Sequence, residues 1–208
     1  MKGFEDRDFE VFTIDGLEPR MEGLKERIRP KLASIGETLA PYLTRRTGEE
    51  MFIHVAKHAR RTVHPPDETW VAWSPQKRGY KSQPHFQLGI RESELFAMFA
   101  LIYEYPAKPE FAQNLLQQLD EILPHLPSDF VLSRDHTRPE VHPLSKLGRE
   151  GLTAALERLQ SVKKAEFLCG RVWSREDPRI HDPSQLEAMI RETFVSLEPL
   201  YRLARLSH

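Results

Sequence analysis

The stretch His85-Phe-Gln-Leu-Gly-Ile90 carries an apolar side chain at every second position, which is the spacing of a β-strand with one buried face. The same period of two runs through Met51-Phe-Ile-His-Val55. A third strand-like run, Thr69 to Ser74, follows the turn-forming Pro65-Pro66-Asp67. The apolar run Leu95 to Tyr103 is either a fourth strand or a buried helix, because periodicity does not separate the two in so uniformly apolar a segment.

A helical pattern precedes these strands. Apolar residues recur every three or four positions from Leu17 to Leu39, so we expect an amphipathic helix there. Pro30 and Pro41 each lack a backbone N–H, which predicts a kink near Arg29 and a helix end near Ala40.

Helices mixed with single strands follow the strand cluster. Helical spacing covers residues 109–123, 152–162 and 186–201. Asp182 is the expected cap of the last helix and Pro183 its first residue. Strand-like runs cover residues 130–133 and 165–173. This order favours the α+β class, with a mainly antiparallel sheet covered by helices in a two-layer sandwich. The length and the lack of a linker or repeat predict one domain over residues 1–208.

The overall charge excludes some classes of function. Lys and Arg number 30 and Asp and Glu number 31, so the formal net charge of −1 predicts no general attraction to nucleic acid or anionic membranes. Residues Met1 to Asp6 turn acidic where a secretory peptide would turn apolar. The run Leu95 to Tyr103 is far shorter than the roughly 20 residues of a membrane helix. We expect a cytoplasmic protein that does not bind membranes.

The only cysteine, Cys169, lies in the apolar run Glu166-Phe-Leu-Cys-Gly170. One thiol cannot form an internal disulfide or a thiolate zinc cage. Its apolar neighbours predict a buried, inert thiol rather than a nucleophile.

Common catalytic motifs are missing from the sequence. It has no glycine-rich dinucleotide loop, phosphate loop or Gly-x-Ser-x-Gly turn, and nothing indicates a particular cofactor. His54-Val-Ala-Lys-His58 has the histidine spacing of a zinc protease, but Val55 stands where the glutamate base must be, so we expect no metal there. Asp135-His136-Thr137 predicts a turn held by Asp135 rather than a catalytic pair, since adjacent extended residues point to opposite faces.

Local charge is the strongest functional feature. Between His54 and His85, six cations face only Asp67 and Glu68, with histidines and aromatic residues among them. Arginine binds phosphate through two parallel hydrogen bonds and aromatic faces stack on bases, so this composition predicts a site for a nucleotide or nucleic acid. The candidate ligand-binding residues are Lys57, His58, Arg60, Arg61, Lys77, Arg78, Tyr80, Lys81 and His85. The alternative is a solvated basic face, with the tryptophans of this segment in the core.

Several longer segments resemble a known family. They are Gly48-Glu-Glu-Met-Phe52, His54-Val-Ala-Lys-His-Ala-Arg-Arg61, Lys77-Arg-Gly-Tyr-Lys81, Pro84-His-Phe-Gln87, Asp135-His-Thr137 and Leu159-Gln-Ser-Val-Lys-Lys-Ala-Glu166. They resemble the YktB-like proteins of bacilli and relatives, an uncharacterised family with a domain of unknown function. The resemblance implies a bacterial cytosolic α+β protein and assigns no catalytic residue. His64 stands where we expect the family to have asparagine.

Three functions remain open from the sequence. The first is a module that binds a phosphate-bearing ligand through the basic segment. The second is an enzyme acting on a phosphorylated or adenylated small molecule, with His58 or His85 transferring a proton. Lys77-Arg-Gly-Tyr-Lys81 is similar to the basic loop of biotin and lipoate ligases, which implies adenylate-dependent transfer as one such reaction. The third is a protein-interaction module without a small ligand.

Overall fold

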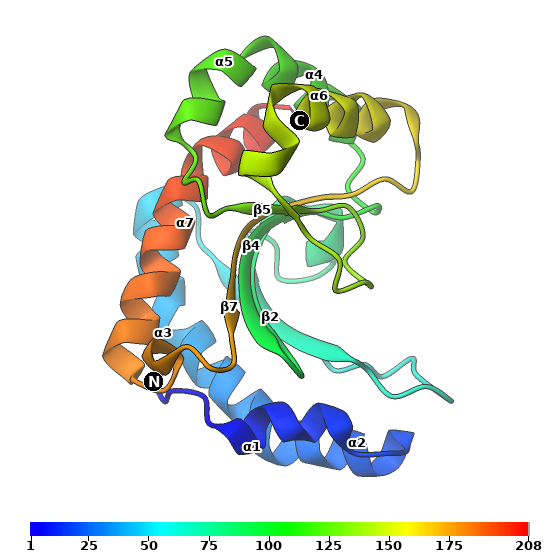
Figure 1. The fold of residues 1–208 in the computed structure, drawn as a ribbon, viewed down its shortest axis with the longest axis vertical. Coiled ribbons are helices and arrows are strands. Elements are labelled where there is room, and N and C mark those ends of the chain that lie inside the picture. The colour runs from blue at the N-terminus through cyan, green and yellow to red at the C-terminus, as the bar shows by residue number, and fades with distance from the viewer. Residues whose placement is uncertain (208) are drawn as a thin grey trace.

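A computed structural model describes residues 1–207 as a curved sheet flanked by helices (Figure 1). Every strand pairing is antiparallel, and the order across the sheet is β1-β2-β3-β4-β7-β5-β6. The strands are β1 (Phe52–Val55), β2 (Glu68–Ser74), β3 (His85–Arg91), β4 (Glu94–Leu101), β5 (Val131–Ser133), β6 (His142–Pro143) and β7 (Phe167–Ser174). The predicted α+β class, an antiparallel sheet covered by helices, is confirmed.

Strand β4 settles the nature of the apolar run that periodicity left open. It pairs with β3 on one side and β7 on the other, and seven of its eight residues are buried. Both faces of such a central strand pack against other side chains, so its sequence contains no polar alternation. Leu95 and Phe99 join the main core, whereas Phe96 and Met98 join a smaller cluster on the opposite face.

The first long helix continues past the predicted end near Ala40, which was wrong. It consists of α2 (Leu17–Gly23), a π-helical turn η2 (Leu24–Ile28) and α3 (Arg29–Thr47), which ends at Gly48 with φ of 78°. The π-helical turn ends at Ile28, two residues before Pro30, so the irregular stretch of the helix lies next to this proline. Pro41 lies inside α3 and has no N–H to donate to the carbonyl of Glu37, four residues earlier. Both Pro41 and Glu37 are exposed. That carbonyl lies on the solvent side of the helix, so α3 continues.

Helices α3 and α7 (Pro183–Leu206) lie along one face of the sheet (Figure 1). Helix α3 packs on β1 and β2, and α7 packs on β3, β4 and β7. The predicted start of α7 is confirmed, since the Asp182 carboxylate accepts hydrogen bonds from the backbone N–H groups of Ser184 and Gln185 at 2.9 and 2.8 Å.

Two further helices, α4 (Lys108–Gln117) and α6 (Leu144–Ser161), pack on each other at the end of the sheet drawn at the top of Figure 1. The shorter turns are α1 (Asp6–Phe9), η1 (Glu10–Thr13), η3 (Tyr80–Ser82), α5 (Leu119–Ile122), η4 (Leu123–His125) and η5 (Pro178–Ile180). Within residues 1–207, no helix combines the length and apolar character needed to cross a membrane.

The face of the sheet away from α3 and α7 carries a different set of side chains. Residues directly opposite on neighbouring strands share a face, so His54 and Gln87 lie in one row, and Trp70 and Phe96 lie in the next. Phe96 lies over Gly89, where an added Cβ would fall 1.9 Å from its ring. This second face therefore combines polar and aromatic groups beside the predicted basic segment.

Candidate anion-binding site

Strand pairing brings the two halves of the basic segment to Trp70. The chain leaving β1 stays beside β2 for one more residue, because the Ala56 N–H donates to the Trp70 carbonyl at 2.9 Å. From the other side, Gly79 adopts φ of 70°, and the chain then enters the turn η3. This turn directs Tyr80 inward, where its hydroxyl accepts a 2.9 Å hydrogen bond from the Trp70 indole N–H.

A cavity of about 530 Å³ lies where these segments meet. It is lined by six of the nine predicted residues, namely Lys57, His58, Arg60, Arg61, Tyr80 and Lys81. The wall is completed by Ala56, Ala59, Trp70, Gly79, Glu104 and His136. We refer to it as the basic cavity. Its size lies within the range of small-molecule pockets.

The other three predicted residues lie outside the basic cavity. Lys77 extends over the ring of Phe52, with 5.1 Å between its Nζ and the ring centroid. Arg78 is exposed to solvent. The His85 side chain is fully buried behind Tyr80, whose ring meets it edge-on at 5.2 Å between centroids.

Cations in the basic cavity are not neutralised by neighbouring carboxylates. Within residues 1–207, Lys57, Arg60, Arg61 and Lys81 take part in no ion pair. Arg171 on strand β7 differs, since it binds Asp129 and Glu192 at 2.8 and 3.0 Å. Among residues 1–207, Glu104 is the only residue with a side-chain carboxylate that lines the cavity. The charges on the cavity wall therefore favour an anion.

His58 occupies a strained position in the cavity wall. Its φ of 51° makes it the only non-glycine residue with positive φ in the described chain. Its Nε2 lies 3.1 Å from the Thr69 hydroxyl, and its ring meets Trp70 edge-on at 5.5 Å between centroids. Burial, and then the positive charges of nearby residues, of which Arg61 has the largest effect, lower the pKa of His58 to about 4. The imidazole is therefore neutral at physiological pH.

His136 also lines the basic cavity, and the sequence did not predict it as a site residue. The predicted turn is confirmed, since the Asp135 carboxylate accepts hydrogen bonds from the N–H and hydroxyl of Thr137 at 2.9 and 2.6 Å. The carboxylate that holds His136 comes instead from Glu166, 30 residues later. Strand pairing explains the contact, because Ser133 at the end of β5 lies opposite Leu168 near the start of β7. No local pattern in the sequence signals this pair.

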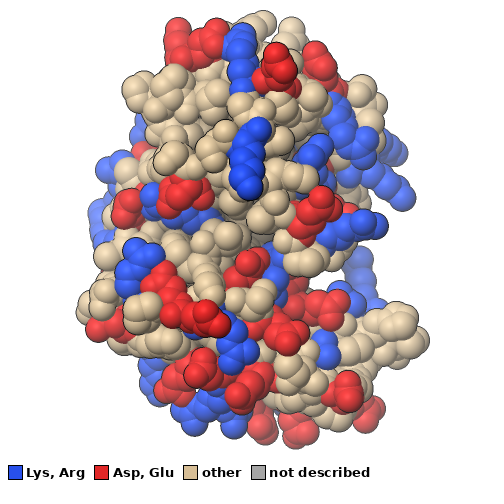
Figure 2. All heavy atoms as spheres, viewed as in Figure 1, with Lys and Arg blue, Asp and Glu red and all other residues tan. Residues whose placement is uncertain are grey.

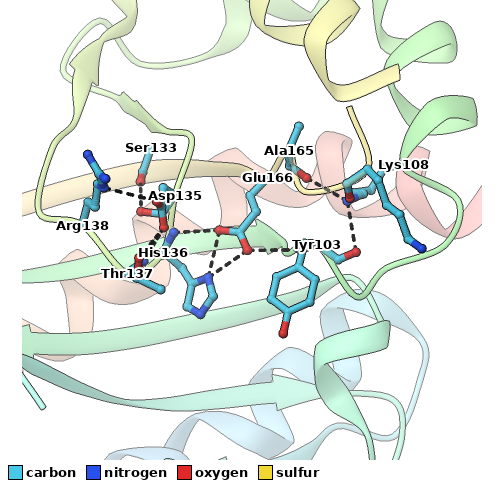
Figure 3. A network of polar contacts seen from close by, with 10 residues as sticks. Tyr103, Lys108, Ser133, Asp135, His136, Thr137, Arg138, Ala165 and Glu166 are labelled. Carbon is cyan, nitrogen blue, oxygen red and sulfur yellow. Dashed lines mark hydrogen bonds and ion pairs between the residues drawn. The ribbon is translucent and has the colours of Figure 1, made fainter. Parts of the chain in front are cut away.

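Glu166 is buried and held by three groups (Figure 3). Its carboxylate accepts hydrogen bonds from the backbone N–H groups of Tyr103 and His136 at 3.2 and 2.7 Å. The Nδ1 of His136 lies 2.9 Å from both carboxylate oxygens. A carboxylate can only accept, so Nδ1 carries a proton, and Nε2 is the ring nitrogen that Glu166 does not hold. In Figure 3 this second nitrogen is turned away from Glu166.

A second cavity of about 700 Å³ also has His136 in its wall. Its wall contains charges of both signs, namely the cations Arg134, Arg138, Arg158 and Lys164 and the carboxylates Asp135, Glu140 and Glu166. Figure 2 shows charges of both signs interspersed over the visible face, with Lys and Arg gathered along its upper right edge.

Asp135, His136 and Glu166 offer metal-type ligand atoms within 4.8 Å of one another. However, the Nδ1 of His136 and both oxygens of Glu166 already bind each other. The Asp135 carboxylate is likewise held, by the N–H and hydroxyl of Thr137 and by Arg138. This donor set therefore fits an anchored imidazole better than a metal centre.

Comparison with known proteins agrees with the resemblance seen in the sequence. The profile of a family described as a domain of unknown function (DUF1054) matches residues 4–201. A UPF0637 protein of Bacillus velezensis is 47% identical over 202 residues, which cover 97% of this chain and 96% of that protein. A UPF0637 protein of Bacillus thuringiensis strain Al Hakam is 49% identical, and the match covers 98% of this chain and 98% of that protein. One of Bacillus cereus strain B4264 is also 49% identical, with 96% of each chain covered. The chain therefore belongs to the DUF1054 family, whose UPF0637 members in bacilli match it along nearly their whole length.

Proposed function

We propose that the protein binds a small phosphate-bearing ligand, of the size of a nucleotide, in the basic cavity. The observation that carries this proposal is the convergence on one cavity, around Trp70, of four cations that form no ion pair within residues 1–207. Arginine and lysine side chains supply charge-assisted hydrogen bonds to phosphate oxygens, and aromatic rings offer flat faces to a base.

The size of the cavity favours a small ligand over a nucleic acid strand. A polymer contacts many phosphates along an extended basic groove. Here the cations gather in about 530 Å³, and the net charge of the chain is −1. Lys81 extends over the Trp70 ring at 5.8 Å from its centroid, so a bound phosphate and a stacked base would lie close together.

Isothermal titration calorimetry with ADP, AMP and pyrophosphate tests the proposal. Arg60→Ala should weaken binding by roughly ten- to a hundredfold, because one charge-assisted contact is lost. Arg78→Ala is the matched control, since Arg78 belongs to the same basic segment but lies outside the cavity. It should change affinity by less than about twofold, because Arg78 does not line the cavity and salt screens its more distant charge. Thermal melts should show both variants folded.

Two outcomes would contradict the proposal. In the first, none of the three phosphate compounds binds, which would favour a protein-interaction module. In the second, a short single-stranded oligonucleotide binds with steep salt dependence while the small compounds do not, which would favour nucleic acid.

A further inference from the structure

The imidazole of His136 is the best-anchored titratable group in the wall of the basic cavity. Its side chain is 14% exposed and that of Glu166 is 5% exposed, so their hydrogen bond is shielded from water. Trp70 lies edge-on to the ring at 6.3 Å and Tyr103 stacks on it at 6.5 Å between centroids. Nε2 of His136 has no hydrogen-bond partner among residues 1–207.

A carboxylate that fixes one nitrogen of an imidazole leaves the other nitrogen ready to accept a proton. Glu166 holds the proton on Nδ1, orients the ring, and stabilises the imidazolium that forms when Nε2 is protonated. Because the carboxylate is itself fixed by two backbone N–H groups, it needs little reorganisation as the charge develops.

We propose that His136 is the general base of a phosphate ester hydrolase whose substrate binds in the basic cavity, with Glu166 as its positioning residue. This inference rests on the proposed function, because the substrate is the phosphate-bearing ligand itself. Nε2 takes a proton from water while the water oxygen forms a bond to phosphorus and the bond from phosphorus to the ester oxygen breaks. The proton then passes from Nε2 to the departing oxygen, which leaves as an alcohol.

Cations of the cavity supply the remaining requirement of this reaction. Negative charge on the phosphoryl oxygens must be balanced as water attacks, and cations lining the cavity can do this. Arg60, Arg61 and Lys81 line the same wall as His136. The products are a phosphate with one ester bond fewer and an alcohol, and no redox partner is required.

Neither histidine that the sequence favoured for proton transfer has comparable geometry. Nε2 of His58 is held by the Thr69 hydroxyl, and with a pKa lowered to about 4 its ring does not retain a proton near neutral pH. His85 is fully buried and does not line the basic cavity.

Two chromogenic esters, bis(4-nitrophenyl) phosphate and 4-nitrophenyl phosphate, test the inference as a diester and a monoester. The wild-type protein should release 4-nitrophenolate from at least one of them. His136→Asn keeps an N–H donor near Glu166 but lacks Nε2, so kcat should fall by roughly 10²- to 10⁴-fold. Affinity for ADP should stay within about twofold in calorimetry, because the cations remain. His64→Asn, at an exposed site outside the cavity, is the matched control and should retain full turnover.

Glu166→Gln separates positioning from mere structural support. Its amide cannot hold the Nδ1 proton as strongly, so kcat should fall while KM stays nearly constant. The acid limb of the pH–rate profile should also shift. A variant that simply loosened the fold would lower the melting temperature without moving that limb.

The outcomes separate the two proposals. If the wild-type protein binds ADP but hydrolyses neither ester, the hydrolase inference is wrong and the binding proposal stands. Equal turnover by wild type and His136→Asn would likewise overturn the role of His136. If no phosphate compound binds and no ester is hydrolysed, the binding proposal fails and the inference falls with it.

Discussion

His85 illustrates how burial determines the chemistry of a single residue. Desolvation lowers the pKa of its imidazole to about 4, and the hydrogen bond between Nδ1 and the Gln83 carbonyl, at 2.9 Å, only partly opposes this. Between about pH 6.5 and pH 4 the unfolded chain binds a proton here and the folded protein does not. The contribution of His85 to stability is therefore fully present above pH 6.5 and is lost as the pH falls to about 4.

We expect the free energy of unfolding of the wild-type protein to fall more steeply with acid than that of His85→Gln. From about pH 7 to pH 4, the free energy of unfolding should fall by roughly 3 kcal/mol more in the wild-type protein than in His85→Gln. Urea unfolding at successive pH values measures this difference. Burial raises the pKa of Glu68 to about 7, so this carboxyl makes the folded protein more stable as the pH falls. Its effect is the same in both proteins and cancels when they are compared.

His64→Gln serves as the control for this measurement, because His64 is exposed and its replacement should leave the slope unchanged. Parallel pH dependence of wild type and His85→Gln would mean that the His85 ring is protonated in the folded protein.

At the scale of elements, helix α3 continues through Pro41, although the sequence predicts that the helix ends there. Pro41→Ala should raise the free energy of unfolding by about 1–2 kcal/mol, because the new N–H can bond the carbonyl of Glu37 and alanine is the best helix former. Some of this gain is offset by the greater freedom of the unfolded chain. Chemical denaturation gives the difference directly.

The second proline of this comparison, Pro109, lies in the first turn of α4, where a backbone N–H has no partner within the helix. Pro109→Ala should therefore produce no gain. If both substitutions raised the free energy of unfolding equally, the lost helical hydrogen bond would not be the reason that Pro41 destabilises the protein.

Most elements were predictable from the sequence because their patterns are local. The strands β1, β2 and β3 followed from alternation and turn residues, and the start of α7 followed from Asp182 and Pro183. Pairing between β5 and β7 was not predictable, because it depends on how distant segments pack. The contact between His136 and Glu166 depends on that pairing and was missed for the same reason.

For the molecule as a whole, Cys169 reports on global unfolding. The predicted burial is confirmed, since Cys169 is 0% exposed on central strand β7, and burial raises the pKa of its thiol to about 12. A thiol reagent should modify the native protein only as fast as the molecule unfolds, and the rate should rise with urea in step with loss of structure. Complete modification within minutes under native conditions would show that β7 opens locally.

The candidate site could be predicted only in part at this scale. Six of the nine predicted residues share one cavity because the loop after β1 and the turn η3 after β2 both come back to Trp70. The pattern of charges in the sequence could not show that Lys77 extends over Phe52. Nor could it show that His85 is buried behind Tyr80. These positions depend on the path of the loop before β3 and on the face of the sheet to which each side chain points. Whether the six bind a phosphate compound stays a prediction.

The position of Trp70 makes the molecule its own optical probe. Trp73 and Trp173 are 0% and 7% exposed, so their emission is shielded from solutes, whereas Trp70 is half-buried in the cavity wall. Lysines and arginines around it attract anions and repel cations. Iodide should therefore quench the accessible fluorescence far more strongly than caesium, and an occupant of the cavity should abolish that asymmetry while leaving the other two indoles unchanged.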